Sequence, residues 1–145
     1  MNPEINRFYR TLVREAPDAI VYADAEGLIA FWNKGAERVF GFSQAEAVGK
    51  ALDLIIPENL RKRHWEGFKE TVRTGKTRYG AGDVLAVPAL RKDGARISIE
   101  FTILPFFDRT GRILGIAAIL RDVTKRFDAM KALRKELAAR RTGEA

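Results

Sequence analysis

The fold of this chain is decided by the segment Ala30-Phe31-Trp32-Asn33-Lys34-Gly35-Ala36-Glu37-Arg38-Val39-Phe40-Gly41-Phe42. An apolar, strand-like run ends at Asn33, and the apolar residues after it have the spacing of one helical face: Ala36, Val39 and Phe40. Gly41 ends this short helix. Ser43, with Glu46 three residues later, has the pattern of a capping box. The segment therefore predicts a strand followed closely by two short helices.

Hydrophobic periodicity extends this prediction along the chain. It predicts helices over 3–14 and 58–72, a glycine-rich loop over 75–82, and strands over 19–24, 28–32, 84–90, 95–106 and 112–121. The last three strands are joined by Arg91-Lys92-Asp93-Gly94 and Asp108-Arg109-Thr110-Gly111, whose Asp and Gly are typical of hairpin turns. The last strand is apolar almost throughout, which favours a central place in the sheet.

Length and composition are those of one globular domain. The chain has 145 residues, of which 46% are hydrophobic. It has no apolar run near the roughly 18 residues that a membrane span needs. The start, Met1-Asn2-Pro3-Glu4, lacks the basic and apolar regions of a signal peptide. We therefore expect a cytoplasmic protein with no membrane partner.

The net charge of +7 does not by itself indicate nucleic-acid binding. Much of the positive charge lies in Arg61-Lys62-Arg63 and in the tail from Lys125 to Arg141. Neither run alternates with aromatic residues, as a surface that stacks bases would. Solvated helix faces account for the charge, and no nucleic-acid partner is expected.

Three motifs in order resemble the PAS family of sensory domains. They are the Asn33 to Gly41 segment, the turn Arg91-Lys92-Asp93-Gly94, and the junction Arg121-Asp122-Val123-Thr124. The resemblance covers residues 16–124. It implies an α+β PAS fold: a five-stranded antiparallel sheet with helices over one face, flanked by N- and C-terminal helices. The domain organisation expected is an N-terminal helix over 1–15, the PAS domain over 16–124, and a signalling helix and tail over 125–145.

The chain contains no cysteine. Thiolate nucleophiles and thiolate metal sites are therefore excluded. Within the PAS family, so are the flavin photo-adduct of LOV domains and the chromophore tether of photoactive yellow protein. No order of Ser, His and Asp indicates a catalytic triad, and Gly80-Ala81-Gly82 is too short for a phosphate loop. The chain is expected to be a sensor, not an enzyme.

The single histidine, His64, suggests a cofactor. The segment from Pro57-Glu58 to Arg63-His64 is similar to that of haem-binding PAS domains of the FixL type. The resemblance implies that His64 ligates the iron of haem b and that the domain senses a diatomic gas. The expected pocket residues are His64, Phe68, Arg78, Tyr79, Leu85, Val87, Ile99, Phe101, Ile103, Ile116 and Ala118.

Two further features refine the haem hypothesis. Leu85 stands where the oxygen sensors carry an arginine, so carbon monoxide or nitric oxide is expected to bind better than oxygen. Arg78 or Tyr79 would supply the only polar contact on that side. Arg73, Lys76 and Arg78 would suit haem propionates, because cations pair with carboxylates.

Other readings of the same residues stay open. His64 would then be a packing residue, and the domain would serve only to associate with other PAS domains. A small apolar ligand is a further possibility, with an anchor from Tyr22, Trp32, Asn33 or Arg78. Flavin held without a covalent bond is another.

The C-terminal segment predicts self-association. Phe127, Met130, Leu133 and Leu137 recur every three or four residues on a highly charged helix. The seam favours a homodimer, and the N-terminal helix would join the same interface. The resemblance implies that a signal leaves the sheet through Asp122-Val123-Thr124 toward this helix and an output domain or partner protein.

Overall fold

The computed structural model describes residues 2–77, 79–80 and 82–143. Its centre is one antiparallel sheet of five strands in the order β2-β1-β5-β4-β3. The strands are β1 (Ala19–Asp24), β2 (Ile29–Trp32), β3 (Leu85–Leu90), β4 (Arg96–Phe107) and β5 (Ile113–Asp122). The apolar strand β5 lies in the middle of the sheet, which confirms the prediction from its sequence.

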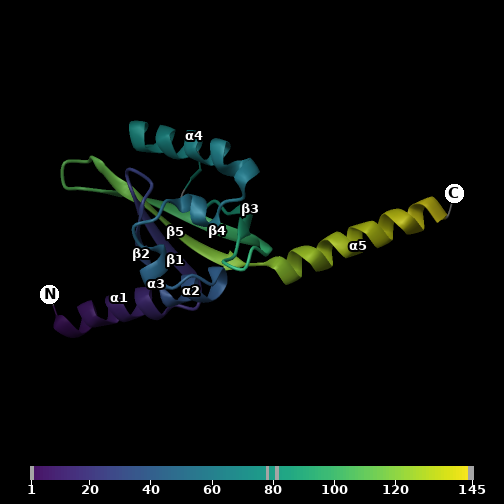
Figure 1. Cartoon of the computed structure of the whole chain (residues 1–145), viewed down its shortest axis with the longest axis horizontal. Helices are drawn as coiled ribbons and strands as arrows, with labels where there is room; N and C mark the ends of the chain where they lie inside the picture. The colour runs from purple at the N-terminus through teal and green to yellow at the C-terminus, as the bar shows by residue number, and fades with distance from the viewer. Residues whose placement is uncertain (1, 78, 81, 144–145) are drawn as a thin grey trace.

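Helices cover one face of this sheet and extend from its two ends (Figure 1). They are α1 (Pro3–Glu15), α2 (Lys34–Phe40), α3 (Gln44–Ala47), the 3-10 helix η1 (Leu52–Ile55), α4 (Glu58–Thr74) and α5 (Thr124–Gly143). The short helices α2 and α3 follow the predicted caps: Asn33 caps α2, and Ser43 with Glu46 forms the capping box of α3. Within the described residues, no helix combines the length and apolar character of a membrane span.

The strand register places the hydrophobic core on the face that the helices cover, called here the inner face. Val21 pairs with both Trp32 and Ala118, and Phe101 pairs with Leu120. Side chains at directly opposed positions lie on the same face. The core combines these strand residues with buried residues of the helical layer: Ala36, Val39, Phe40, Ala47 and Ile55.

The opposite, outer face of the sheet is apolar and exposed. Leu104, Phe106 and Ile119 are 66%, 53% and 50% exposed. Tyr22 lies edge-on to Phe106 on this face, with ring centroids 6.1 Å apart. The sheet therefore has two different sides: a covered inner face and an apolar outer face in contact with solvent.

Asn33 joins the helical layer to the sheet. Its carboxamide oxygen accepts hydrogen bonds from the backbone N–H groups of Ile20 and Ala36, both at 2.8 Å. Its Nδ2 donates to the carbonyls of Val13 at 2.9 Å and Asp18 at 3.1 Å. The side chain is buried, at 3% exposed. One amide thus fixes the end of α1, the start of β1 and the start of α2.

Replacing Asn33 with Asp should destabilise the domain. The acceptor oxygen stays, but the donor becomes a carboxylate oxygen that faces buried carbonyls. Because buried groups left without partners cost about 1–3 kcal/mol each, we expect a loss of roughly 3 kcal/mol or more in the free energy of unfolding. Urea denaturation measures it. Asn59→Asp, at an exposed position on α4, is the matched control; equal stability of the two variants would contradict the assignment.

Candidate functional site

Helix α4 presents one stripe of side chains to the inner face. His64, Phe68 and Thr71 lie at positions i, i+4 and i+7, and Phe68 and Thr71 are buried. His64 is half-buried between them and the start of the helix. Figure 1 shows α4 as the outermost layer over the sheet. The predicted ligand residue therefore lies on the face of α4 that is turned toward the core.

The imidazole of His64 is held by rings and not by hydrogen bonds. Its centroid lies 4.8 Å from that of Trp65 and 5.9 Å from that of Phe68. Its Nδ1 is the one buried side-chain nitrogen or oxygen atom in the described chain that has no hydrogen-bond partner. Burial lowers the pKa of His64 from its ordinary 6.5, and the carboxylate of Asp53 opposes this effect. The ring is therefore neutral at pH 7, the form in which imidazole ligates metals.

The strands bring the other predicted pocket residues together. Across the strands, Leu85 pairs with Phe101, Val87 with Ile99, and Ile103 with Ala118. Ile116 lies two residues before Ala118 on β5 and therefore on the same face. All seven lie on the inner face, because alternate residues of a strand share a face. Ala86, between Leu85 and Val87, lies on the outer face. Ala86 therefore does not line the candidate site, whereas Leu85 and Val87 do.

This apolar surface is only partly covered by α4. Ile99, next to the short helices, is buried, whereas Val87 on the same face is 38% exposed. Leu85, Phe101, Ile103, Ile116 and Ala118 are also only partly buried. The layer between α4 and strands β3 to β5 therefore contains apolar side chains that are still partly accessible to solvent. This layer, with His64 on its helical side, is the candidate site.

The polar residues predicted near the pocket are exposed, paired elsewhere or outside the described residues. Arg78 lies outside the described residues, and Tyr79 is exposed in the loop before β3. Arg73 is already paired with Glu70, with Nη2 2.7 Å from Oε1. A hollow of about 400 Å³ lies at the C-terminal end of α4, where Arg73 and Arg112 both contribute to its lining.

Three of the residues proposed as polar anchors for a small ligand do not face the candidate site, and two of them, Trp32 and Asn33, have structural roles. Trp32 is buried, and its indole N–H donates to the carbonyl of Phe42 at 2.9 Å. Asn33 uses its whole carboxamide within the fold, as described above. Tyr22 belongs to the outer face of the sheet, away from α4. None of the three side chains turns a free polar group toward the candidate site, so that part of the prediction is wrong.

The sequence did not identify Asp53 and Trp65 as part of the site. Asp53 lies in η1, and its Oδ1 accepts a hydrogen bond from Trp65 Nε1 at 2.6 Å. No spacing rule connects two residues on different helices. The one sequence feature that could have indicated Trp65 as a site residue is that it directly follows His64.

The donor set fits one kind of metal group. The described residues contain no group of three or more His, Asp or Glu side chains that would hold a bare ion. A metal at His64 would therefore have to bring most of its ligands with it, as the iron of a porphyrin does. A single neutral imidazole beside a partly covered apolar surface fits that requirement.

Sequence comparisons agree with the fold. A family model described as "PAS fold" matches residues 7–123. An uncharacterized protein of Azorhizobium caulinodans is 30% identical over 87% of the chain. Sensor protein FixL of Bradyrhizobium diazoefficiens is 31% identical over 65% of the chain, and oxygen sensor protein DosP of Escherichia coli is 31% identical over 52%. The aligned regions make up 17%, 18% and 9% of these relatives, so the chain spans less than a fifth of their lengths.

Structural comparison gives the same fold. The PAS domain of a protein from Colwellia psychrerythraea superposes with a TM-score of 0.72 at 26% identity, over 83% of this chain and 98% of that one. An RNA-binding light-oxygen-voltage receptor superposes with a TM-score of 0.74 over 95% of this chain and 39% of that one. Its identity is 19%, which shows the shared fold alone.

The environment of His64 predicts an unusual titration. Because the chain has one histidine, its imidazole proton signal in an NMR titration is unambiguous. The midpoint should lie below 6.5, since burial disfavours the charged ring. The unfolded chain then binds a proton more readily than the folded one, so stability should fall as the pH drops below about 6.5. A midpoint at or above 6.5 would show that the ring is solvated.

Proposed function

This chain belongs to the PAS family, and from that premise we propose that it is a haem-binding sensory module and not an enzyme. In the proposal His64 ligates the iron of haem b, and the domain responds to a diatomic gas. The resemblance to haem-binding PAS domains of the FixL type around His64 motivates this choice. The relatives named as sensor FixL and oxygen sensor DosP support it.

One observation carries the proposal: the only histidine shares the inward stripe of α4 with the buried Phe68, and its Nδ1 is buried without a hydrogen-bond partner among the described residues, while apolar residues on the inner face of the sheet stay partly exposed. A packing histidine usually finds a hydrogen-bond partner for each buried nitrogen. The Nδ1 of His64 has none within the described chain. A group bound in this layer would give the partly exposed residues Leu85, Val87, Ile103 and Ile116 the apolar contacts that they lack.

The residues that would hold haem have distinct roles. His64 would supply the protein ligand, and haem iron would supply reversible binding of a diatomic gas. Leu85, Val87 and Ile103 would pack against the macrocycle and exclude water. Leu85 and Val87 offer no hydrogen-bond donor to a bound gas, which favours the nearly apolar carbon monoxide, or nitric oxide, over oxygen.

The signal would leave through the end of β5. The backbone N–H of Ser98 in β4 donates to Thr124 Oγ1 at 3.0 Å, and the backbone N–H of Val123 donates to the carbonyl of Ser98 at 2.9 Å. The backbone N–H of Thr124 also donates to Asp122 Oδ1 at 2.9 Å. A shift of β4 against β5 would therefore change the direction in which α5 starts.

The second candidate is a cofactor-free domain that only associates with other PAS domains. The exposed apolar stripe of α1 and the exposed outer face of the sheet favour it. Colour separates the two functions. A Soret band in protein purified from haem-supplied cells supports the sensor, whereas a protein that stays colourless after haem addition supports the association domain.

The variant His64→Ala tests the ligand. We expect the unchanged protein to bind one haem per chain and the variant to lose stoichiometric binding, because no second histidine can replace the ligand. The variant should still fold, since Ala favours the helix. Arg63→Ala, at an exposed position on α4, is the matched control. Equal haem titrations for His64→Ala and the unchanged protein would show that His64 is structural.

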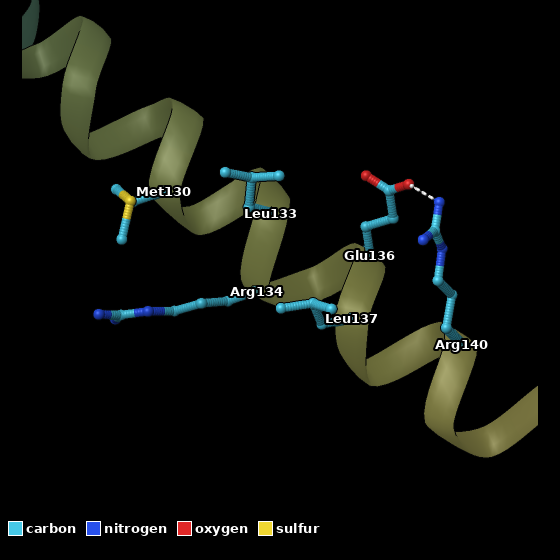
Figure 2. Close-up of a pocket in the computed structure, with 6 residues that line it drawn as sticks. All are labelled: Met130, Leu133, Arg134, Glu136, Leu137 and Arg140. Atoms are coloured by element: carbon cyan, nitrogen blue, oxygen red, sulfur yellow. Dashed lines mark hydrogen bonds and ion pairs between the residues drawn. The ribbon is translucent and has the colours of Figure 1, made fainter.

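Homodimerisation through the terminal helices is the second part of the proposal. Helix α5 has no buried residue, and it extends away from the rest of the molecule (Figure 1). Met130, Leu133 and Leu137 succeed one another along it and line a shallow hollow beside the Glu136–Arg140 ion pair (Figure 2). The three apolar residues have the a, d, a spacing of a heptad.

Both terminal helices have apolar residues that need a partner. In a parallel pair of α5 helices, Glu136 at position g would face Arg141 at position e of the second copy, which is an attractive pairing. Helix α1 carries Phe8, Tyr9 and Leu12, which are 54%, 54% and 55% exposed. A second copy would cover both stripes, so we place the homodimer contact on α1 and α5.

A double substitution in the seam tests the dimer. Leu133→Asp with Leu137→Asp should weaken self-association without unfolding the sheet, because burying charge in a coiled coil is costly. Ala132→Asp with Ala139→Asp makes the same charge change on another side of α5 and should leave the dimer intact. Analytical ultracentrifugation compares the masses. A dimer that survives the leucine substitutions unchanged would move the contact away from α5.

A further inference from the structure

Three residues around His64 form a cluster that ligand binding itself does not require. Trp65 follows His64 on α4, Asp53 lies in η1, and Gly27 lies in the turn between β1 and β2. The three come from separate parts of the chain and meet at the indole of Trp65. Their contacts join α4 to η1 and to the β1–β2 turn.

The first contact joins α4 to η1. Trp65 Nε1 donates to Asp53 Oδ1 at 2.6 Å. One turn earlier, Arg61 Nε donates to the carbonyl of Ile56 at 3.0 Å. A hydrogen bond to a carboxylate is stronger than one between neutral groups. The first half of α4 is therefore tied to η1 and to Ile56, the residue after it, by bonds on either side of His64 along the chain.

The second contact joins α4 to the sheet. Gly27 has φ +85°, and a Cβ atom added to it would lie 2.3 Å from Cη2 and Cζ3 of Trp65. The six-membered ring of Trp65 therefore rests on the bare backbone of the β1–β2 turn. Asp24 holds this turn, because its Oδ1 accepts from the N–H groups of Glu26 at 2.9 Å and Leu28 at 3.0 Å. Trp65 thus contacts a turn whose shape is held by side-chain hydrogen bonds.

The third contact reaches His64 itself. The planes of the His64 and Trp65 rings meet at 76°, and those of Trp65 and Phe68 meet at 73° with centroids 5.3 Å apart. Aromatic rings in such edge-to-face contacts restrict one another. Since Nδ1 has no hydrogen bond to fix the imidazole, its orientation depends on this packing.

We infer that Trp65 and Asp53 are positioning residues that hold His64 toward the inner face of the sheet. Trp65 sets the orientation of the imidazole, and Asp53 sets the position of Trp65. The inference rests on the proposed function where it concerns haem. The positioning itself also exists in the protein without haem, so the two can be tested separately.

A double-mutant cycle tests the pair. Trp65→Phe keeps an aromatic ring and removes the donor, whereas Asp53→Ala removes the acceptor. Because residues that orient a metal ligand typically contribute 10- to 100-fold to affinity, each variant should lose haem affinity by about that factor. The double variant should lose little more than either single one, since both remove the same bond. Asp53→Asn keeps the Oδ1 acceptor and should restore most of the affinity.

Two readouts distinguish positioning from general stability. In haem-free protein, hydrogen exchange should accelerate in α4 of Trp65→Phe but not in β1 or β5, and the His64 imidazole signal should shift. In haem-loaded protein, the iron–imidazole stretching band should broaden. Glu66→Gln, on the exposed side of α4, is the control and should change neither.

Two results would overturn the inference that Trp65 positions His64. Equal acceleration of exchange in α4 and β5 would make Trp65 a general stabilising residue and overturn the inference. An unchanged His64 signal and unchanged exchange in Trp65→Phe would do the same. If the unchanged protein takes up no haem, the proposed function fails, and the haem-free measurements still decide whether Trp65 and Asp53 position His64.

Discussion

The carboxamide of Asn33 is the interaction on which the rest of this structure depends. It satisfies backbone groups of α1, β1 and α2 at once, so the direction in which the chain leaves the first hairpin is fixed by one side chain. Gly35 adds a steric constraint, because a Cβ there would lie 2.0 Å from the carbonyl oxygen of Asp18. Together they place the helical layer on the inner face, and α4 then follows over the remaining apolar surface.

The two faces of the sheet have different environments. The inner face holds the core, which includes Ala89 of β3 and Ile97 of β4, and also the partly exposed apolar residues of the candidate site. The outer face carries Leu104, Phe106 and Ile119 in contact with solvent. Strand β5 contributes to both faces and leads into α5 through Thr124. A change on the inner face therefore has a covalent and hydrogen-bonded route to the terminal helix.

The sequence predicted what depends on local pattern. The capping box at Ser43 and the central place of β5 follow from spacing and composition, as do the strand bounds to within a residue. The PAS resemblance supplied a list of pocket residues, and the strand register places seven of them on one face of the sheet. The bond between Asp53 and Trp65 and the internal use of Asn33 depend on contacts between distant segments, which no local pattern encodes.

The contact between Gly27 and Trp65 has a consequence for how such sequences diverge. The backbone angle at position 27 alone would admit asparagine or aspartate, which enter the left-handed region more readily than other residues. The indole leaves no room even for a methyl group. Descendants of this chain can therefore lose the glycine only after, or together with, a smaller side chain at position 65. The two positions should therefore covary as a pair.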